Sequence, residues 1–293
     1  MIYIRNTTAI IPTNDYVFKK IFGKVGNEII TKGLLNSILE DKVSSIDLEG
    51  NTILAKEYKD EKLGILDVKA KIDDKYLCDI EMQVLDNKNI EKRIMYYWSK
   101  LYISGIKQGE NYSKLNKTIS ILILNYEIEN FKIIEKIHTE WKIREKDYRK
   151  TLLTDILEIH IIELPKLKKL NIKQKTNNNL ITWAKFFVNP DMLEEEEMKS
   201  NKAVKLAKEE LDKMRQDEYE ERIAELRMKH IMDSKSLEEY GYDKGEKNGK
   251  NEMQKIIVRN MLSQNMKIED IVKITGLTKE EIEKLEEKRD IEK

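Results

Sequence analysis

Two carboxylates in a hairpin-like segment are the residues of this chain best placed for chemistry. The stretches GILDVKAKI (64–72) and YLCDIEMQV (76–84) flank the turn 73–75, and both alternate apolar and polar residues as strands do. If pairing is centred on the middle turn residue, Asp67 lies directly opposite Glu81. Opposed side chains on neighbouring strands have Cβ atoms about 4.5–5.5 Å apart. The two carboxylates are therefore expected side by side on one face of the sheet.

Like charges placed opposite each other destabilise a sheet, so a compensating positive charge is expected. A divalent cation is one candidate, because Mg²⁺ is commonly held by one or two carboxylates together with water and a substrate phosphate. The alternative is that Lys69 or Lys71 neutralises the pair on a solvated sheet face. Asp79 has the same parity as Glu81 but lies nearer the turn, so we expect it to be a rim charge rather than a ligand.

Helices and further strands must surround this hairpin. Residues 14–40 have helical spacing interrupted by glycines, which predicts a helix or a helix pair, and residues 90–107 predict an amphipathic helix. Residues 118–126 and 155–163 are short apolar runs rich in β-branched residues, which predicts buried strands. The order helix, hairpin, helix, strand predicts the α/β class, with a mixed sheet flanked by helices.

The composition of the 293-residue chain excludes several classes of protein. Charged residues make up 37% of the chain, whereas Gly (11) and Pro (3) are scarce, which favours long helices over linker-like or collagen-like chains. The single Cys78 cannot form an intramolecular disulfide, and the three histidines have no zinc-site spacing. The longest apolar runs are far below the roughly 18–20 residues of a membrane span. We expect no membrane association and a cytoplasmic location in a prokaryote.

The net charge of zero conceals three zones. Residues 1–190 carry a net charge of +6 and are expected to form the main domain. Residues 191–250 carry −5 with few large aliphatics, and predict a charged helix or linker rather than a globular core. Residues 251–293 regain helical periodicity and predict a small helical tail.

The tail has the outline of a helix-turn-helix. Gly276 is placed as a helix C-cap, and Thr278 with Glu281 forms a capping box that opens the last helix. That last helix is rich in glutamate, which suits the major groove poorly. We therefore expect a packing or self-association module, and a homodimer through the C-terminal helices.

Several blocks of the sequence together resemble a known family. NDYVFKKIFG (14–23), LDVKAKI (66–72), DIEMQV (79–84) and RIMYYWSKLY (93–102) are similar to the Rpn family of recombination-promoting nucleases, also described as transposases, within the PD-(D/E)XK nuclease superfamily. The tail from 249 to 285 resembles the same family. The resemblance implies a mixed four-stranded sheet flanked by helices.

The resemblance also implies roles for individual residues. Asp67 and Glu81 would bind Mg²⁺ or Mn²⁺, and the backbone carbonyl of Met82 would complete the metal site. Gln83 stands where most of the superfamily has a lysine that orients the attacking water. A glutamine can only hydrogen-bond, so activation of the water would depend more on the metal.

Other residues have weaker assignments. Asp15 would be an accessory acid by resemblance, although a helix cap explains it equally well. Arg93 would contact the DNA backbone or form ordinary surface, and Lys69 would steady the scissile strand. Two basic runs are either solvated faces or phosphate contacts, and the second of them contains Lys166, Lys168 and Lys169.

Two functions remain open at this stage. The first is a Mg²⁺-dependent DNA endonuclease that hydrolyses phosphodiester bonds and is associated with recombination or mobile elements. The second is a catalytically weak or decayed nuclease fold that acts as a DNA-binding or protein-interaction module. Retention of both carboxylates favours the first, and the loss of lysine at Gln83 favours the second.

Overall fold

The computed structural model of the chain describes residues 8–49, 68–86, 89–169 and 178–291, with side chains to residue 285. The chain forms two compact units, one ending at His230 and the other beginning at Ile231. Among the helices in these ranges, none combines the length and apolarity that crossing a bilayer requires.

The first unit is of the α/β class, as the sequence predicts. Its strands are β1 (Ile46–Leu48), β2 (Val68–Ile72), β3 (Tyr76–Gln83), β4 (Thr118–Leu124), β5 (His138–Trp141) and β6 (Leu157–Glu163). Its helices are α1 (Asp15–Phe22), α2 (Glu28–Ile38), α3 (Ile90–Ser104), α4 (Asn178–Val188), α5 (Glu195–Ser200) and α6 (Lys202–Met214), and α7 (Glu218–Ser263) begins there.

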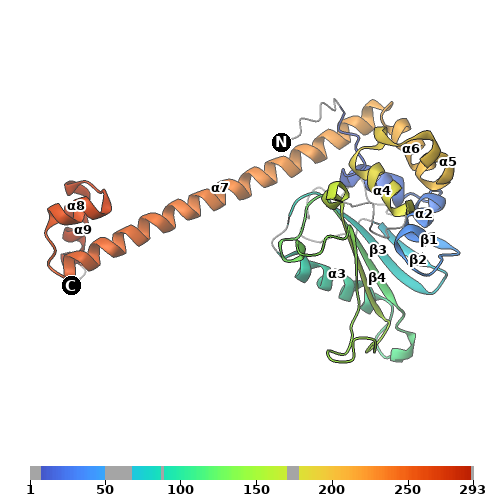
Figure 1. Ribbon diagram of the computed structural model, residues 1–293, viewed down its shortest axis with the longest axis horizontal. Helices are drawn as coiled ribbons and strands as arrows, with labels where there is room; N and C mark the ends of the chain where they lie inside the picture. Colours follow the sequence, from blue (N-terminus) through green and yellow to red (C-terminus); the bar gives the residue numbers. More distant parts are fainter. Residues whose placement is uncertain (1–7, 50–67, 87–88, 170–177, 292–293) are drawn as a thin grey trace. The chain divides into compact units, whose positions relative to one another are not determined.

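The strands form one mixed sheet in the order β1-β2-β3-β4-β6-β5 (Figure 1). The β1–β2, β2–β3 and β5–β6 pairs are antiparallel, whereas β3–β4 and β4–β6 are parallel. Six strands are described where the family resemblance implies four, since β1 and β5 extend the sheet at its two edges. The central strands are therefore enclosed on both sides by hydrogen-bonded neighbours.

The β2–β3 hairpin has the predicted register. Val68 pairs with Ile80 and Ile72 pairs with Tyr76, so pairing is centred on Asp74. Asp73 and Asp74 both have positive φ, at 50° and 55°, a conformation that aspartate tolerates better than most residues. The Asp73 carboxylate also accepts hydrogen bonds from the backbone N–H groups of residues 44 and 45, which lower its pKa and fix the turn against the preceding loop.

Helices cover the sheet on both faces (Figure 1). On one face, the alternate strand residues Cys78, Ile80 and Met82 join the main core with α1, α2, α4 and α6. An aromatic cluster lies in that core, built from Phe18, Phe22, Trp183, Phe186 and Phe187. The other face is covered by α3, which buries Ile90 and Ile94 against Leu122, Leu124 and the inner residues of β6.

The segment after residue 190 packs more closely than its charge suggests. It was expected to lack a core, but Ala203, Val204, Ala207 and Leu211 of α6 are buried in the main cluster. Because Ala203, Val204 and Ala207 are small, the highly charged α6 can lie close to α2 along one narrow face. The compact unit extends to His230, forty residues beyond the expected boundary. Residues 241–250, which are rich in glycine and lysine, are helical within α7.

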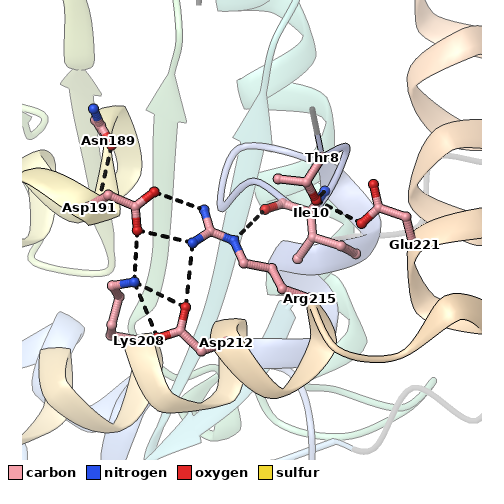
Figure 2. Close-up of polar contacts among 8 residues, drawn as sticks. All are labelled: Thr8, Ile10, Asn189, Asp191, Lys208, Asp212, Arg215 and Glu221. Atoms are coloured by element: carbon pink, nitrogen blue, oxygen red, sulfur yellow. Dashed lines mark hydrogen bonds and ion pairs between the residues drawn. The ribbon is translucent and has the colours of Figure 1, made fainter. Parts of the chain in front are cut away.

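Ion pairs connect α6 to the segments beside it (Figure 2). The Asp191 carboxylate accepts hydrogen bonds from Arg215 at 3.0 Å and from Lys208 at 2.9 Å, and both cations lower its pKa. Arg215 also reaches the backbone oxygen of Ile10, and Thr8 donates to Glu221 at 2.7 Å. The charges of residues 191–221 thus attach the first described residues to α6 and α7.

The second unit contains a small helical cluster. α8 (Ile268–Thr275) and α9 (Lys279–Ile291) pack with the end of α7 around Val258, Leu262, Ile271 and Ile282. Gly276 caps α8 with a φ of 69°, and Thr278 and Glu281 make the reciprocal contacts of the predicted capping box.

The contact between α2 and α6 supplies a test of this packing. A Cβ built on Gly33 lies 2.1 Å from the Cβ of Ala203, so Gly33→Ala forces the two helices apart. We expect a loss of at least about 2 kcal/mol in the free energy of unfolding, measured by urea denaturation, because overpacking outweighs the better helix propensity of alanine.

The control is Gly241→Ala on α7, where nothing lies within 4 Å, so no such loss is expected. The double variant Gly33→Ala/Ala203→Gly restores the space and should be more stable than Gly33→Ala alone. Equal stability of wild type and Gly33→Ala would contradict the close α2–α6 contact.

Candidate functional site

Glu81 lies on the central strand β3, between the antiparallel β2 and the parallel β4. It belongs to the face covered by α3 and is buried, with 5% of its surface exposed. A carboxylate at such a place is costly unless polar or cationic groups meet it. The local sequence produces this placement because the acidic residues of β3 alternate with the apolar residues that build the main core.

The partner predicted for Glu81 is Asp67, which lies outside the described residues. The register of the described pairs leads up to it, since Val68 pairs with Ile80. Lys69 is half-buried and pairs with Asp79, and strand alternation puts it on the same face as Glu81.

Among the described residues, Gln83 and Arg93 approach the Glu81 carboxylate. Gln83 donates a hydrogen bond from Nε2 to Oε2 of Glu81 at 3.3 Å, and a terminal nitrogen of Arg93 lies 4.0 Å from the same oxygen. Arg93 comes from α3, where its guanidinium stacks over the ring of Tyr97 at 5.3 Å. Met82 faces the opposite side, in the main core, so only its backbone can serve the Glu81 face.

Asp79 differs from its expected role as a rim charge. It is buried, with 2% exposed, and its Oδ1 accepts a hydrogen bond from Ser120 at 2.6 Å. The cause is the pairing of β3 with β4, which encloses the start of β3 and brings Ser120 beside Asp79. The parity of Asp79 was visible in the sequence, but the β4 neighbour that buries it was not.

Asp15 does not stand free at the start of α1. Asn14 is the N-cap, with its side chain accepting from Tyr16 N, and Asp15 accepts from the same N–H at 2.8 Å. The Asp15 carboxylate is also ion-paired with Arg227 of α7. The cap of α1 is therefore Asn14 rather than Asp15, and the ion pair with α7 gives Asp15 a structural contact within the first unit.

The three lysines predicted as phosphate contacts have different surroundings. Lys166 is 1% exposed; its ammonium donates to the buried Glu163 carboxylate and, at 3.0 Å, to a backbone oxygen. Because Lys166 is enclosed in this way, it cannot reach a phosphate, and the predicted phosphate contact of Lys166 is wrong. Lys168 is exposed, and Lys169 is exposed but paired with Glu127 at 2.6 Å.

A second polar cluster was missed at the sequence level. His138 Nε2 lies 2.8 Å from His160 Nδ1, and His160 Nε2 lies 2.9 Å from Glu158. Burial, together with the neighbouring His160, lowers the pKa of His138 to about 4. Although burial opposes ionisation, hydrogen bonds from His160 and Lys117 lower the pKa of Glu158 to about 2.

The sequence contained one signal for this cluster. Glu158 and His160 alternate with apolar residues in a strand that is otherwise apolar up to its last residue, Glu163, and a polar pair on one face of such a strand needs partners. The linear spacing of the histidines carried no information, because β5 and β6 bring His138 and His160 together only through strand pairing.

The comparison with known protein families agrees with the fold. The family described as PD-(D/E)XK nuclease family transposase matches residues 12–241, which is most of the chain. No curated protein and no solved structure is significantly similar to it. The match begins just before α1, includes every strand of the sheet and ends within α7. The chain therefore belongs to the PD-(D/E)XK nuclease family transposases.

Proposed function

We propose that this protein is a metal-dependent DNA endonuclease that hydrolyses phosphodiester bonds. The observation that carries the proposal is the buried Glu81 carboxylate on β3, with Gln83 and Arg93 beside it. Its expected partner Asp67 lies outside the described residues. Family membership supports a nuclease-type function and a DNA substrate.

The residues around Glu81 fit a hard divalent cation. Asp67, Glu81 and the backbone carbonyl of Met82 offer only oxygen ligands, which Mg²⁺ and Mn²⁺ prefer. When bound, such an ion lowers the pKa of a water molecule and polarises a phosphate oxygen. Burial of Glu81 between β2 and β4 keeps its carboxylate in a fixed orientation and limits its competing contacts with water.

Gln83 supports the site without supplying a charge. Its amide donates to Oε2 of Glu81 at 3.3 Å, which orients the carboxylate, and the amide oxygen can accept a hydrogen bond from a water molecule. Gln83 is in this respect a positioning residue for Glu81. The absence of an ammonium group there leaves proton removal from the attacking water to the metal site.

Cationic residues beside Glu81 would bind the substrate backbone. Arg93 lies 4.0 Å from Glu81, its Nε is buried without a hydrogen-bond partner among the described residues, and Tyr97 supports its guanidinium. A phosphate near the metal would satisfy this guanidinium, because arginine binds phosphate with several N–H groups at once. Lys69 on the same face and the exposed Lys168 are further candidates for phosphate contact.

The wider role that we propose is in DNA recombination or mobile-element activity. It would act in a prokaryotic cytosol at the nucleoid, where its substrate is. A homodimer through the C-terminal helices would suit cleavage of both strands. The apolar contacts of α8 and α9 with α7 define the module that would mediate it.

One observation favours a second function. The neutral Gln83 lacks the charge that most of the superfamily supplies at this position, so a weak or decayed nuclease that only binds DNA or protein is the alternative. The two functions differ in whether phosphodiester cleavage depends on Asp67 and Glu81.

Substitution of either carboxylate tests the proposal directly. In a plasmid-nicking assay with Mg²⁺ or Mn²⁺, Asp67→Asn and Glu81→Gln are each expected to lower cleavage about 1,000-fold, because the bound ion supplies several kcal/mol of transition-state stabilisation. EDTA should abolish cleavage by the wild type.

The matched control is Glu91→Gln, which removes an acid from the first turn of α3 and should leave the rate unchanged. Cleavage that persists in both carboxylate variants would reject this site. DNA retardation on a gel without any cleavage would favour the alternative function.

Gln83→Ala removes the hydrogen bond to Glu81 and should lower kcat about 10- to 100-fold with little change in KM, as loss of a group that orients a metal ligand does. The measurement is steady-state cleavage at several Mn²⁺ concentrations. A higher Mn²⁺ requirement is also expected. An unchanged kcat would show that Gln83 does not position Glu81.

Arg93→Gln should act on substrate binding. We expect DNA affinity at low salt to fall about 10-fold, and the salt dependence of binding to weaken by roughly one phosphate contact. Filter binding with the Glu81→Gln protein measures this without cleavage. Lys169→Gln, which disrupts a surface ion pair, is the control, and equal losses in both variants would contradict a specific role for Arg93.

A further inference from the structure

A second group of metal-ligating side chains lies on the sheet face opposite to Glu81. Glu158 and His160 of β6 are 5% and 1% exposed, and strand alternation puts them on the face of the main core. Glu140 of the edge strand β5 pairs directly with His160. These residues take no part in the proposed nuclease site.

Their ligand atoms converge on one point. One carboxylate oxygen each from Glu140 and Glu158 and a ring nitrogen of His160 all lie within 4.8 Å of one another. The convergence follows from pairing of β5 with β6, which is antiparallel and in register at Glu140–His160. Carboxylates and imidazole are both ligands of Zn²⁺ and related ions, and a set of three protein ligands leaves a coordination position open.

The orientation of His160 is already fixed as such a site requires. Its Nδ1 meets Nε2 of His138 at 2.8 Å, and its Nε2 is directed to Glu158 at 2.9 Å. A metal-bound histidine almost always uses its second ring nitrogen in a hydrogen bond of this kind, which sets the ring plane and tautomer. His138 therefore has the position of a supporting residue.

Positive charge already occupies the point of convergence. Oε2 of Glu158 accepts from Lys117 at 2.7 Å and lies 3.3 Å from the Lys142 ammonium, which also contacts Glu140. Lys142 bridges the two carboxylates that a cation would join. It lies just after the edge strand β5, so its flexible side chain can withdraw to solvent and leave both carboxylates to a divalent ion.

A small cavity gives access to these carboxylates. It has a volume of about 50 Å³ and is lined by Glu140, Glu158, Lys117 and Lys142 together with residues 39–43 and the β2–β3 turn. This volume has room for water beside an ion, since a cavity needs only about 10–15 Å³ of this kind of volume to hold one water molecule. The remaining coordination position of a three-ligand site would open into this cavity.

We propose that Glu140, Glu158 and Nε2 of His160 bind a Zn²⁺-like transition-metal ion, separately from the nuclease site. The imidazole ligand favours Zn²⁺ over Mg²⁺, which prefers oxygen ligands alone. Binding would replace the bridging contact of Lys142 and join the edge strand β5 to β6. No nuclease step depends on this ion, so the inference stands independently of the proposed function.

The test uses the full-length Glu81→Gln protein, in which the proposed catalytic metal site is removed. Zn²⁺ is titrated in competition with a chromophoric chelator, and one bound ion per chain is expected. Adding Glu140→Gln should weaken the affinity by at least about 10-fold. Adding Lys142→Gln should tighten it by about 10-fold, because a competing positive charge is removed.

The opposite directions of these two variants separate a metal site from a purely structural ion-pair cluster. Glu135→Gln, an acid before β5, is the control and should not change the affinity. Co²⁺ in place of Zn²⁺ should give visible absorption bands that Glu140→Gln diminishes, and excess Mg²⁺ should not compete. Absence of a bound ion, or equal affinity in the Glu140 and Lys142 variants, would overturn the proposal.

Discussion

The arrangement of this protein depends on the burial of β3 on both of its faces. β3 lies between an antiparallel and a parallel neighbour, and helices cover both sides of the sheet. Every polar side chain on it must therefore find a partner or a bound ion, because a buried unpaired charge is costly. Asp79 meets this requirement with Ser120, and Glu81 has Gln83 and Arg93 at its carboxylate. The burial of β3 thus encloses the carboxylates of Asp79 and Glu81 on the same face of the sheet, where each needs a polar or cationic partner.

The charged region after residue 190 serves the fold rather than standing apart from it. Small apolar residues on α6 pack against α2, and its acids and bases connect to the first described residues and to the start of α7 (Figure 2). Tyr16 of α1 donates to Glu220 at 2.6 Å, and Asn14 donates to the backbone of Ala224. Most of these ion pairs are partly exposed, so each contributes little alone, and the buried alanines account for the close approach.

The hairpin shows what local sequence rules can predict. Alternation and turn residues sufficed for the register of β2 with β3, since both depend on neighbours in the chain. The burial of Asp79, the contact of Lys166 with the backbone oxygen of Phe131 and the meeting of His138 with His160 could not be predicted, because each joins segments that are distant in sequence. The high charge of α6 also hid its contribution to the core, because a few small residues at helical spacing are enough to pack against α2.

Strand alternation explains why one sheet can hold two chemically different polar clusters. On β3 the acidic positions face α3, whereas on β6 Glu158 and His160 face the main core. The sheet backbone separates the two groups, so a cation bound at one does not share ligands with the other. The face of Glu81 carries carboxylates with Gln83 and Arg93 beside them, whereas the second cluster contains the imidazoles of His138 and His160. Because carboxylate oxygens suit hard cations and an imidazole suits transition-metal ions, the side chains of the two clusters differ in the ions that they would favour.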